Sequence, residues 1–330
     1  MSDLTRLPQP ILNLDDENLQ ALMPRLSHDD ATIRLLALIE LAELEDESHV
    51  QWLVWALSDV SADVRREAAA RLAYWEQAGG AIALAGALSD SDPEVREAAA
   101  HSLAELKSAD SGRLLLPWLD STDSFVQASV LRALRELRLP ESEVPARQAL
   151  QAEASSVRME AVGVLGWLRS EPALPAIARL AVHDESAEVR KAAVGALGYA
   201  TSPEVLDALS SAMGDLDWQV REEAASTLGK LKLLPAADVL IGSLSDEYWQ
   251  VRQKAARALG RLRQRSAVGP LIEQALAHEV ANLRKEAAIA LGEIGDRAAL
   301  PALVHAAQDA DPDVRKLSRL AITQIQHERA

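Results

Sequence analysis

Hydrophobic positions follow one pattern that repeats along the chain with a period of roughly 31 residues. Each repeat has an anchor position, which is an arginine in all repeats but one. The anchors are Arg34, Arg65, Arg96, Gln127, Arg158, Arg190, Arg221, Arg252, Arg284 and Arg315. Seven residues after each anchor stand Leu41, Leu72, Leu103, Leu134, Leu165, Leu197, Leu228, Leu259, Leu291 and Ile322. A period of this length predicts a solenoid, in which each repeat buries its apolar face against its neighbours.

Each repeat is predicted to be a pair of helices. In the third repeat, the apolar residues between Val95 and Leu106 recur at the spacing of one helix face, and we term this helix B. Asp92 and Pro93 mark its start, since aspartate is a good N-cap and proline is tolerated at the first helical position. The apolar segment 81–88 predicts a preceding helix A. The fold class is therefore all-α, an α-solenoid of about ten helical hairpins, each as long as one period.

The unbroken repeat predicts one elongated domain. Residues 1–14, which include Pro8 and Pro10, are expected to form an extended N-terminal arm, and residues 15–330 a single repeat domain. Asp15 or Asp16 is the expected cap of the first helix. Aromatic residues make up 3% of the chain, so the core is expected to consist mainly of leucine and alanine.

Composition excludes several classes of function. The chain has no cysteine, which excludes disulfides, thiol nucleophiles and cysteine-ligated metals. The net charge of −16 disfavours binding to nucleic acid and to acidic membranes. No apolar run is long enough for a signal peptide or a membrane span, so a cytoplasmic protein, favoured as a monomer, is expected.

The best-preserved repeat carries a family resemblance. Asp217-Trp-Gln-Val-Arg-Glu-Glu-Ala-Ala-Ser-Thr-Leu-Gly229 resembles the HEAT-like repeats of the phycobilisome lyase (PBS lyase) class. The resemblance covers nearly the whole chain and implies a HEAT-like solenoid. The class includes subunits of bilin lyases, a metal-dependent protein hydroxylase and many bacterial scaffolds, so the resemblance leaves the activity open.

The residues after the anchors argue against the hydroxylase activity. That enzyme uses repeated His-Glu pairs directly after the anchor to hold metal, whereas the corresponding positions here include Arg66-Glu67, Met159-Glu160 and Lys285-Glu286. No metal, no cofactor and no catalytic residue is therefore expected. The function favoured is a non-catalytic scaffold or adaptor for another protein, with assistance to the maturation or assembly of a partner enzyme as one such role. The alternative, and the only enzymatic one, is a subunit of a bilin (tetrapyrrole) lyase.

Aspartates before the anchors predict a ladder of ion pairs. They stand six residues before the anchor, as at Asp59 and Asp90, or four residues before it, as at Asp92. Stacking of the repeats would place them beside the arginines and offset the unfavourable position of a cation in the first turn of a helix. The fifth and ninth repeats lack both aspartates, which makes these repeats candidates for a functional departure.

The main candidate for partner binding lies in the fifth and sixth repeats. Gly163 and Gly195 occupy the fifth position after their anchors, and Trp167 and Tyr199 the ninth. Glycine beside an aromatic residue on adjacent B helices would form a notch in the concave face for a ring-bearing ligand or a partner side chain. The alternative is that the glycines relieve crowding and the aromatic rings cover the helix ends.

Other aromatic residues have two interpretations each. Trp218, Tyr248 and Trp249 fall at the turn before helix B in two successive repeats, where they either stack over the anchor arginine or form a partner-binding edge. Trp52 and Trp55 stand three residues apart on a helix A near the end of the stack. They are expected to fill the core, with an exposed docking patch as the alternative.

A local excess of basic residues contrasts with the acidic chain. Eight lysines and arginines fall between Lys230 and Arg265, against three acidic residues. A solvated basic face is one interpretation, and docking of an acidic partner or a phosphate is the other. The candidate docking residues are Lys230, Lys254, Arg257 and Arg261.

Overall fold

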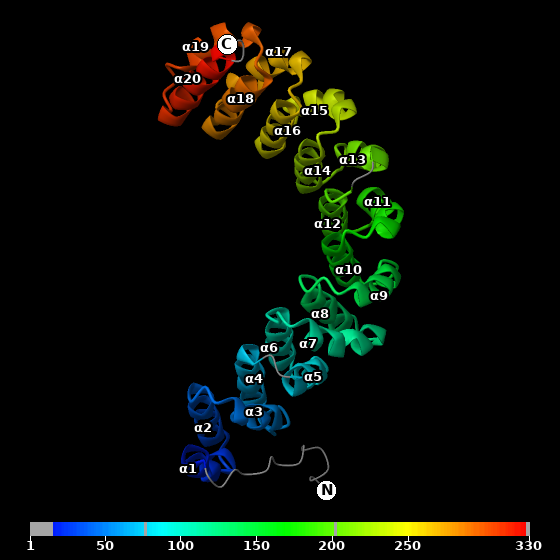
Figure 1. Ribbon diagram of the computed structural model, residues 1–330, viewed down its shortest axis with the longest axis vertical. Coiled ribbons are helices and arrows are strands. Elements are labelled where there is room, and N and C mark those ends of the chain that lie inside the picture. The colour runs from blue at the N-terminus through cyan, green and yellow to red at the C-terminus, as the bar shows by residue number, and fades with distance from the viewer. Residues whose placement is uncertain (1–15, 76–77, 201–202, 328–330) are drawn as a thin grey trace. The chain divides into compact units, whose positions relative to one another are not determined.

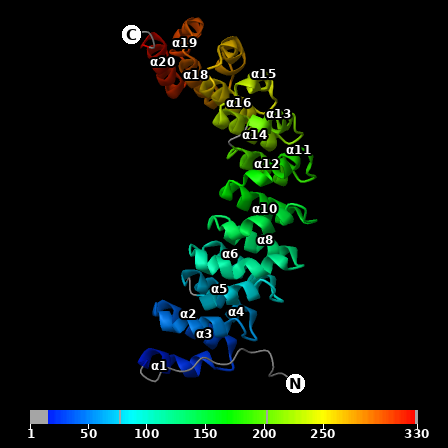
Figure 2. The same cartoon turned by 45° about the vertical axis from the view of Figure 1, so that its right-hand side comes forward.

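The computed structural model describes residues 16–75, 78–200 and 203–327, and within these ranges every regular element is a helix (Figures 1 and 2). Alternate helices are the predicted A and B helices, because every anchor lies in an even-numbered helix. The predicted α-solenoid is confirmed. The N-terminal arm predicted for residues 1–14 lies outside the described residues. The chain divides into two compact units, Met1–Leu168 and Arg169–Ala330.

The first unit consists of five helical hairpins in its described part. The A helices are α1 (Glu17–Leu26), α3 (Val50–Ala56), α5 (Ala78–Ala87), α7 (Ala109–Leu115) and α9 (Glu143–Ala149), and the B helices are α2 (Ala31–Glu43), α4 (Ala62–Arg71), α6 (Pro93–Ala104), α8 (Ser124–Leu134) and α10 (Ser155–Leu168). Short 3₁₀ turns join them at η1 (Glu47–His49), η2 (Leu72–Tyr74), η3 (Leu116–Asp120) and η4 (Pro140–Ser142).

The second unit has the same plan. Its A helices are α11 (Leu174–His183), α13 (Leu206–Ala212), α15 (Ala237–Gly242), α17 (Val268–Pro270) and α19 (Leu300–Ala306), and its B helices are α12 (Ala187–Leu197), α14 (Trp218–Leu231), α16 (Trp249–Arg261), α18 (Ala281–Ile294) and α20 (Pro312–His327). The short elements are η5 (Glu171–Ala173), η6 (Pro203–Val205), η7 (Leu234–Ala236), η8 (Ser243–Ser245), η9 (Arg265–Ala267), η10 (Leu271–Leu276) and η11 (Arg297–Ala299).

Most anchors follow one another at a constant interval. In one of the longer intervals, the structure shows where the extra residue is accommodated. The interval from Arg252 to Arg284 exceeds that from Arg221 to Arg252 by a single residue, and η10 in the longer interval is a π-helix. A π-helix takes more residues per turn than an α-helix, so it absorbs the insertion within the A layer. The B helices on either side keep their register.

Aspartates cap the starts of helices as predicted, and residues in the left-handed conformation follow the ends of several B helices. Asp16 caps α1 and Asp92 caps α6, each by accepting backbone N–H groups, as predicted. Among the described residues, the eleventh residue after the anchor adopts the left-handed conformation in six repeats. These residues are Glu45, Arg138, Arg169, Lys232, Arg263 and Gly295, with φ between 50° and 74°. Such a residue ends a helix and turns the chain towards the next A helix.

The apolar positions of the repeat form the interior. The repeated leucine register is fully buried, with Leu103 and Leu228 at 0% exposure. Trp52 and Trp55 are both buried and meet edge to face at 6.0 Å between ring centroids, which confirms that they fill the core. Interior packing of this kind supplies most of the stability of short helices, which are marginal in isolation.

In the second unit, glycines let the B helices approach each other closely. A Cβ added at Gly229 would lie 2.8 Å from the Ala258 Cα, and one at Gly260 the same distance from the Ala290 Cα. The A helices have no such contacts at Gly242 or Gly269, where a Cβ would meet nothing within 4 Å. The close approach at Gly229 and Gly260 thus lies in the B layer, and the B helices are on the inner side of the bend of this unit (Figure 1).

Candidate protein-binding surface

The anchor arginines form the predicted ladder along the edge of each unit. Each rung joins the anchor of one repeat to the aspartate six residues before the next anchor, with both arginine–carboxylate hydrogen bonds between 2.6 and 3.0 Å. The rungs are Arg34–Asp59, Arg65–Asp90, Arg190–Asp215, Arg221–Asp246 and Arg284–Asp309. Bidentate contacts of this kind are the stronger form of the arginine–carboxylate pair.

Each anchor of these rungs also binds the turn of its own repeat. Arg34 Nη1 donates to the carbonyl oxygens of His28 and Asp29 at 2.7 and 2.9 Å, and Arg221 and Arg284 make the equivalent pair of bonds. The arginine therefore satisfies carbonyl groups of a loop and a carboxylate of the next repeat at once. This role is structural, because each of the three guanidinium nitrogens donates to a fixed acceptor of the fold.

The two aspartate positions have different structural roles. The one six residues before the anchor closes the rung, whereas the one four residues before it, as in Asp92 and Asp217, is an N-cap. Asp123 does both where Ser121 replaces the first aspartate: it caps α8 and accepts one hydrogen bond from Arg96 at 2.9 Å. The Arg284 guanidinium lowers the pKa of Asp309, so this rung stays ionised in acid below the ordinary range of aspartate.

The fifth repeat lacks its aspartates for a reason that lies in the fourth. Its position for the rung is Ala152, and the anchor that would reach it is Gln127 rather than arginine. Gln127 instead donates to the Leu119 carbonyl at 2.8 Å. A groove of about 780 Å³ lies at this place, lined by Gln127, Ala152, Ala154 and neighbouring residues. The rung has thus been lost on both sides, which explains the departure without a functional site.

We expect that the missing rung can be restored. Gln127→Arg combined with Ala152→Asp recreates the pairing of the other rungs, and we expect the two changes to be coupled by about 1–2 kcal/mol in a double-mutant cycle. Gln127→Arg alone should give no gain, because it adds a cation without a carboxylate. Urea unfolding of the four proteins measures the coupling, and the matched control is the same cycle with Gln127→Lys, alone and together with Ala152→Asp. A coupling no larger with arginine than with lysine would contradict the bidentate geometry.

The ninth repeat departs in a different way. His278 takes the place of the aspartate, and its Nδ1 accepts the backbone N–H of Val280 at 3.1 Å, as an aspartate does elsewhere. Arg252, the anchor before it, donates to the Asp246 carbonyl and makes no ion pair within the described part of the chain. His278 therefore preserves the turn but not the rung.

The four notch candidates are divided between the two units. Gly163 and Trp167 belong to the first unit, and Gly195 and Tyr199 to the second. In each case the space beside the glycine holds a neighbouring side chain: a Cβ at Gly163 would lie 2.9 Å from Arg135 Cδ, and one at Gly195 3.2 Å from Glu223 Oε1.

Each aromatic ring of this set lies under a cation. The Arg138 guanidinium carbon is 4.9 Å from the centroid of the Trp167 ring, and that of Arg169 is 5.9 Å from the centroid of Tyr199. Lys230 Nζ lies closer to Tyr199, at 4.2 Å. The two arginines are left-handed residues that end a B helix, a class that the sequence reasoning missed. Cation–π contacts of this kind orient the rings at the ends of the B helices.

The aromatic residues of the turn edge form a stack. The rings of Trp218 and Tyr248 are 5.3 Å apart and nearly parallel, at 12°. The anchor Arg221 lies over Tyr248, at 5.7 Å, so Tyr248 is the residue that makes the expected cation–π contact. Trp249 is half-buried at the start of α16 and makes no aromatic contact that the described residues show. Tyr248 is 39% exposed and remains accessible.

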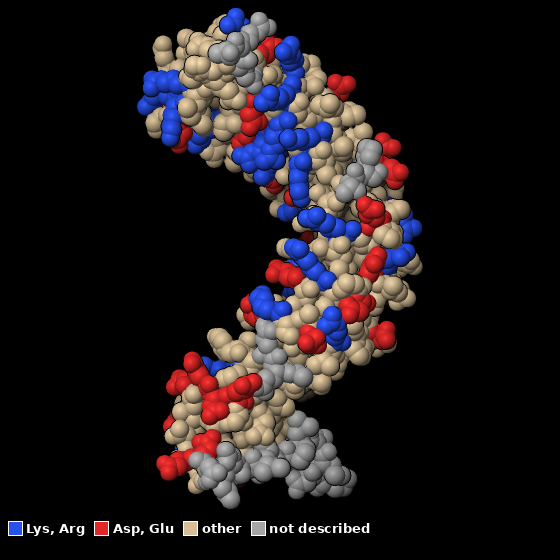
Figure 3. All heavy atoms as spheres, in the orientation of Figure 1, with Lys and Arg blue, Asp and Glu red and all other residues tan. Residues whose placement is uncertain are grey.

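The basic candidates differ in how far they are already paired. Arg257 binds Glu286 through two hydrogen bonds of 2.9 and 2.7 Å, and Lys254 Nζ lies 3.7 Å from Glu222 Oε1. Lys230 and Arg261 are exposed and make no ion pair with any described residue. Figure 3 shows lysine and arginine gathered over α14 and α16 in the second unit.

The first unit has its own groove on the B-helix face. It measures about 870 Å³ and lies between α4 and α6, with Arg66, Glu67, Tyr74, His101 and Glu105 among its lining residues. Tyr74 is 80% exposed, which is unusual for an aromatic side chain of this size. The groove therefore offers a large ring and charged groups to a ligand or partner.

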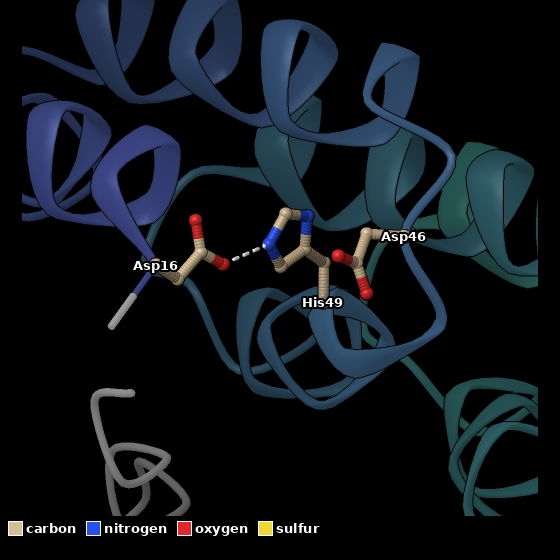
Figure 4. Close-up of side chains that lie close together, drawn as sticks. All are labelled: Asp16, Asp46 and His49. Carbon is tan, nitrogen blue, oxygen red and sulfur yellow. Dashed lines mark hydrogen bonds and ion pairs between the residues drawn. The ribbon is translucent and has the colours of Figure 1, made fainter. Parts of the chain in front are cut away.

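One cluster in the structure was not expected from the spacing of the histidines. Ligand atoms of Asp16, Asp46 and His49 lie within 4.8 Å of one another. Figure 4 shows the two aspartates on opposite sides of the His49 ring, with Asp16 Oδ2 2.6 Å from Nε2. The same carboxylates cap α1 and η1, and the pKa of Asp16 is lowered by its hydrogen bonds from His49 and Leu19. The cluster thus ties the start of α1 to η1.

The repeated hairpins, the buried leucine register and the arginine–aspartate rungs define an α-solenoid. Models of HEAT repeats match residues 50–135, 112–186, 177–250 and 237–323, and the chain belongs to the HEAT-repeat family. No curated protein matches the sequence. No described helix has the length and apolar character needed to cross a membrane.

Solved structures share the fold at low sequence identity. An engineered protein has 23% identity and a TM-score of 0.52, covering 94% of this chain and 99% of its own. The Escherichia coli protein YibA has 20% identity and a TM-score of 0.59 over 74% and 91%. Kap95p, bound to RanGDP, has 17% identity and a TM-score of 0.62, and this chain spans half of its length. At this identity the likeness establishes the fold alone.

Proposed function

We propose that the chain is a non-catalytic scaffold or adaptor that binds another protein through the B-helix faces of its units. The observation that supports this proposal is the placing of exposed aromatic side chains on these faces, Tyr74 at 80% and Tyr199 at 37% exposure, beside charged groups. Tyrosine surrounded by polar groups is typical of protein-binding surfaces. Among the structural neighbours, Kap95p is seen in complexes with RanGDP and with Nup1.

The contact residues that we propose are Trp167 and Tyr199, with Gly163 and Gly195 one turn before them. Both rings are held by arginines at the ends of the preceding B helices, so they lose little side-chain entropy when a partner covers them. The resemblance to the PBS lyase class suggests a partner enzyme whose maturation or assembly is assisted. No contact in the described residues favours a bilin lyase subunit over this scaffold.

Site-specific photo-cross-linking in the native host tests the proposal. A photoreactive phenylalanine analogue placed at Trp167 or Tyr199 is expected to give adducts with the same partner protein, because both positions lie on B helices or directly after them. The matched controls are Val144 and Arg179, which are exposed on the A helices α9 and α11 of the same two units. These positions are expected to give no adduct.

The control positions decide the outcome. Adducts from the A-helix positions alone would show that the partner binds the opposite face, and the proposal would be wrong. The same conclusion would follow if none of the four positions gave an adduct with a second protein. Each variant is first checked for an unchanged helical circular dichroism spectrum, so that loss of an adduct reports on contact rather than on folding.

A further inference from the structure

The C-terminal ends of three successive B helices in the second unit present one row of polar side chains. Tyr199, Lys230 and Arg261 stand at the same position of the repeat, nine residues after their anchors. The first two members of the row are in contact, because Lys230 Nζ lies 4.2 Å from the centroid of the Tyr199 ring. Glu293 takes the same position in the next repeat, and so the basic row ends there.

A second set of cations runs beside this row. Lys232 and Arg263 are left-handed residues two positions after Lys230 and Arg261, and Arg169 takes the same position in the fifth repeat; all three are exposed. Cations at this place are favoured by the negative end of the helix macrodipole. The basic character is therefore built into the helix ends of consecutive repeats and does not come from one loop.

The row has few internal counter-charges. Whereas Arg257 and Lys254 are occupied by Glu286 and Glu222, Lys230, Lys232 and Arg261 form no ion pair with the residues that the structure describes. The surrounding unit is nearly neutral, with 20 lysines and arginines against 22 acidic residues, while the first unit has 14 against 28. Most of the negative charge of the chain is thus outside the unit that bears the row.

We propose that this row binds an extended acidic segment of a partner protein. The inference rests on the proposed scaffold function and adds the chemistry of the partner. Neighbouring packed helices are about 8–10 Å apart, and an extended chain in the polyproline II conformation advances about 3.1 Å per residue with about three residues per turn, so one helix step corresponds to about three residues and side chains at that spacing share a face. The segment therefore carries a carboxylate at every third residue, with Lys230 and Arg261 binding two successive ones. Tyr199 covers an apolar side chain at the end.

An acidic protein segment fits the whole chain better than nucleic acid does. The net charge of −16 repels a polyanion with closely spaced phosphates over a distance of about one Debye length, whereas a peptide with a few spaced carboxylates experiences a weaker repulsion. The spacing of single cations at successive helix ends also suits separate carboxylates. Contacts of this type set partner choice and association rate more than total affinity.

The test is a fluorescence anisotropy titration of the full-length chain with defined peptides. The first probe is a labelled Ser/Gly peptide with glutamate at every third position, and the second has the same composition with contiguous glutamates. We expect the spaced peptide to bind at least about fivefold more tightly. Lys230→Glu with Arg261→Glu should weaken its binding at least about tenfold, because each change replaces attraction by repulsion.

The matched control is Arg179→Glu with Arg297→Glu, which makes the same change in net charge on the A-helix side of the same unit. This variant is expected to bind the spaced peptide within about twofold of the unaltered chain. Equal losses in both double variants, or equal affinity for the two peptides, would overturn the proposal, as would tighter binding of a single-stranded oligonucleotide of equal charge. Cross-linking at Tyr199 is read separately: a failure there with intact peptide selectivity counts against the scaffold function alone.

Discussion

Replacing Asp59 by Asn is expected to lower the free energy of unfolding by about 3–5 kcal/mol. Asp59 accepts two hydrogen bonds from Arg34, at 2.6 and 2.8 Å, and the two residues are only 4% and 5% exposed. The substitution keeps the shape but leaves a buried guanidinium without its counter-charge. Urea unfolding followed by circular dichroism measures the loss, and hydrogen exchange in α2 and α4 locates it.

A neighbouring residue provides the control for this prediction. Asp63 lies four residues further on, and its carboxylate is 3.1 Å from Arg66, but the side chains are 67% and 44% exposed. Asp63→Asn is therefore expected to cost no more than about 0.5 kcal/mol, since solvent screens an exposed pair. If both substitutions cost the same, the rung is not shielded from water. Arg34→Met with Asp59→Leu should restore much of the stability, because it removes both buried charges together.

The repeated hairpins could be predicted because the same sequence pattern recurs in every repeat. A single misread residue does not obscure a register that recurs from Arg34 to Arg315, and the leucine seven residues later confirms each repeat. The ladder followed from the same register. The separate roles of the two aspartate positions could not be predicted from this register. Whether an aspartate is an N-cap or a ladder partner depends on which repeat its side chain faces. Sequence distance does not reveal that direction.

The left-handed residues at the ends of the B helices were missed because most of those described are not glycine, the residue usual at such a position. Gly295 is a glycine in the left-handed conformation, as is usual at the end of a helix, but Arg138, Arg169, Lys232 and Arg263 take the same place. Non-glycine residues adopt this conformation at a cost of about 1 kcal/mol, so sequence-based reasoning does not expect them there. Two of these side chains, Arg138 and Arg169, orient the rings of Trp167 and Tyr199 by cation–π contacts.

The cluster around His49 shows a second limit. His49 and Asp16 lie in different hairpins, and their contact does not recur in the other described repeats. The spacing of acidic residues and histidines within a single helix therefore did not indicate this cluster. A contact that occurs once, near the end of the stack, depends on how the first hairpin is placed on the second, and only the structure supplies that.

Gly229→Ala combined with Gly260→Ala is expected to lower the free energy of unfolding by about 2 kcal/mol, because it overpacks the B layer. Each added Cβ would lie 2.8 Å from a Cα of the next B helix, at Ala258 or Ala290, so a backbone has to move. Overpacking of this kind costs about 1–3 kcal/mol per site, and the better helix propensity of alanine offsets up to about 1 kcal/mol of it. Urea unfolding of the single and double variants measures the effect, and the two sites should be nearly additive.

The control is Gly86→Ala on the exposed side of α5, where an added Cβ meets nothing within 4 Å. This change is expected to stabilise the chain by up to about 1 kcal/mol, since it retains the propensity gain without a clash. A gain of similar size from the double variant would show that the B helices are not in tight contact. The same double variant also bears on binding. Helices forced apart would lengthen the step between Lys230 and Arg261, so affinity for the spaced acidic peptide should fall although neither cation has been changed.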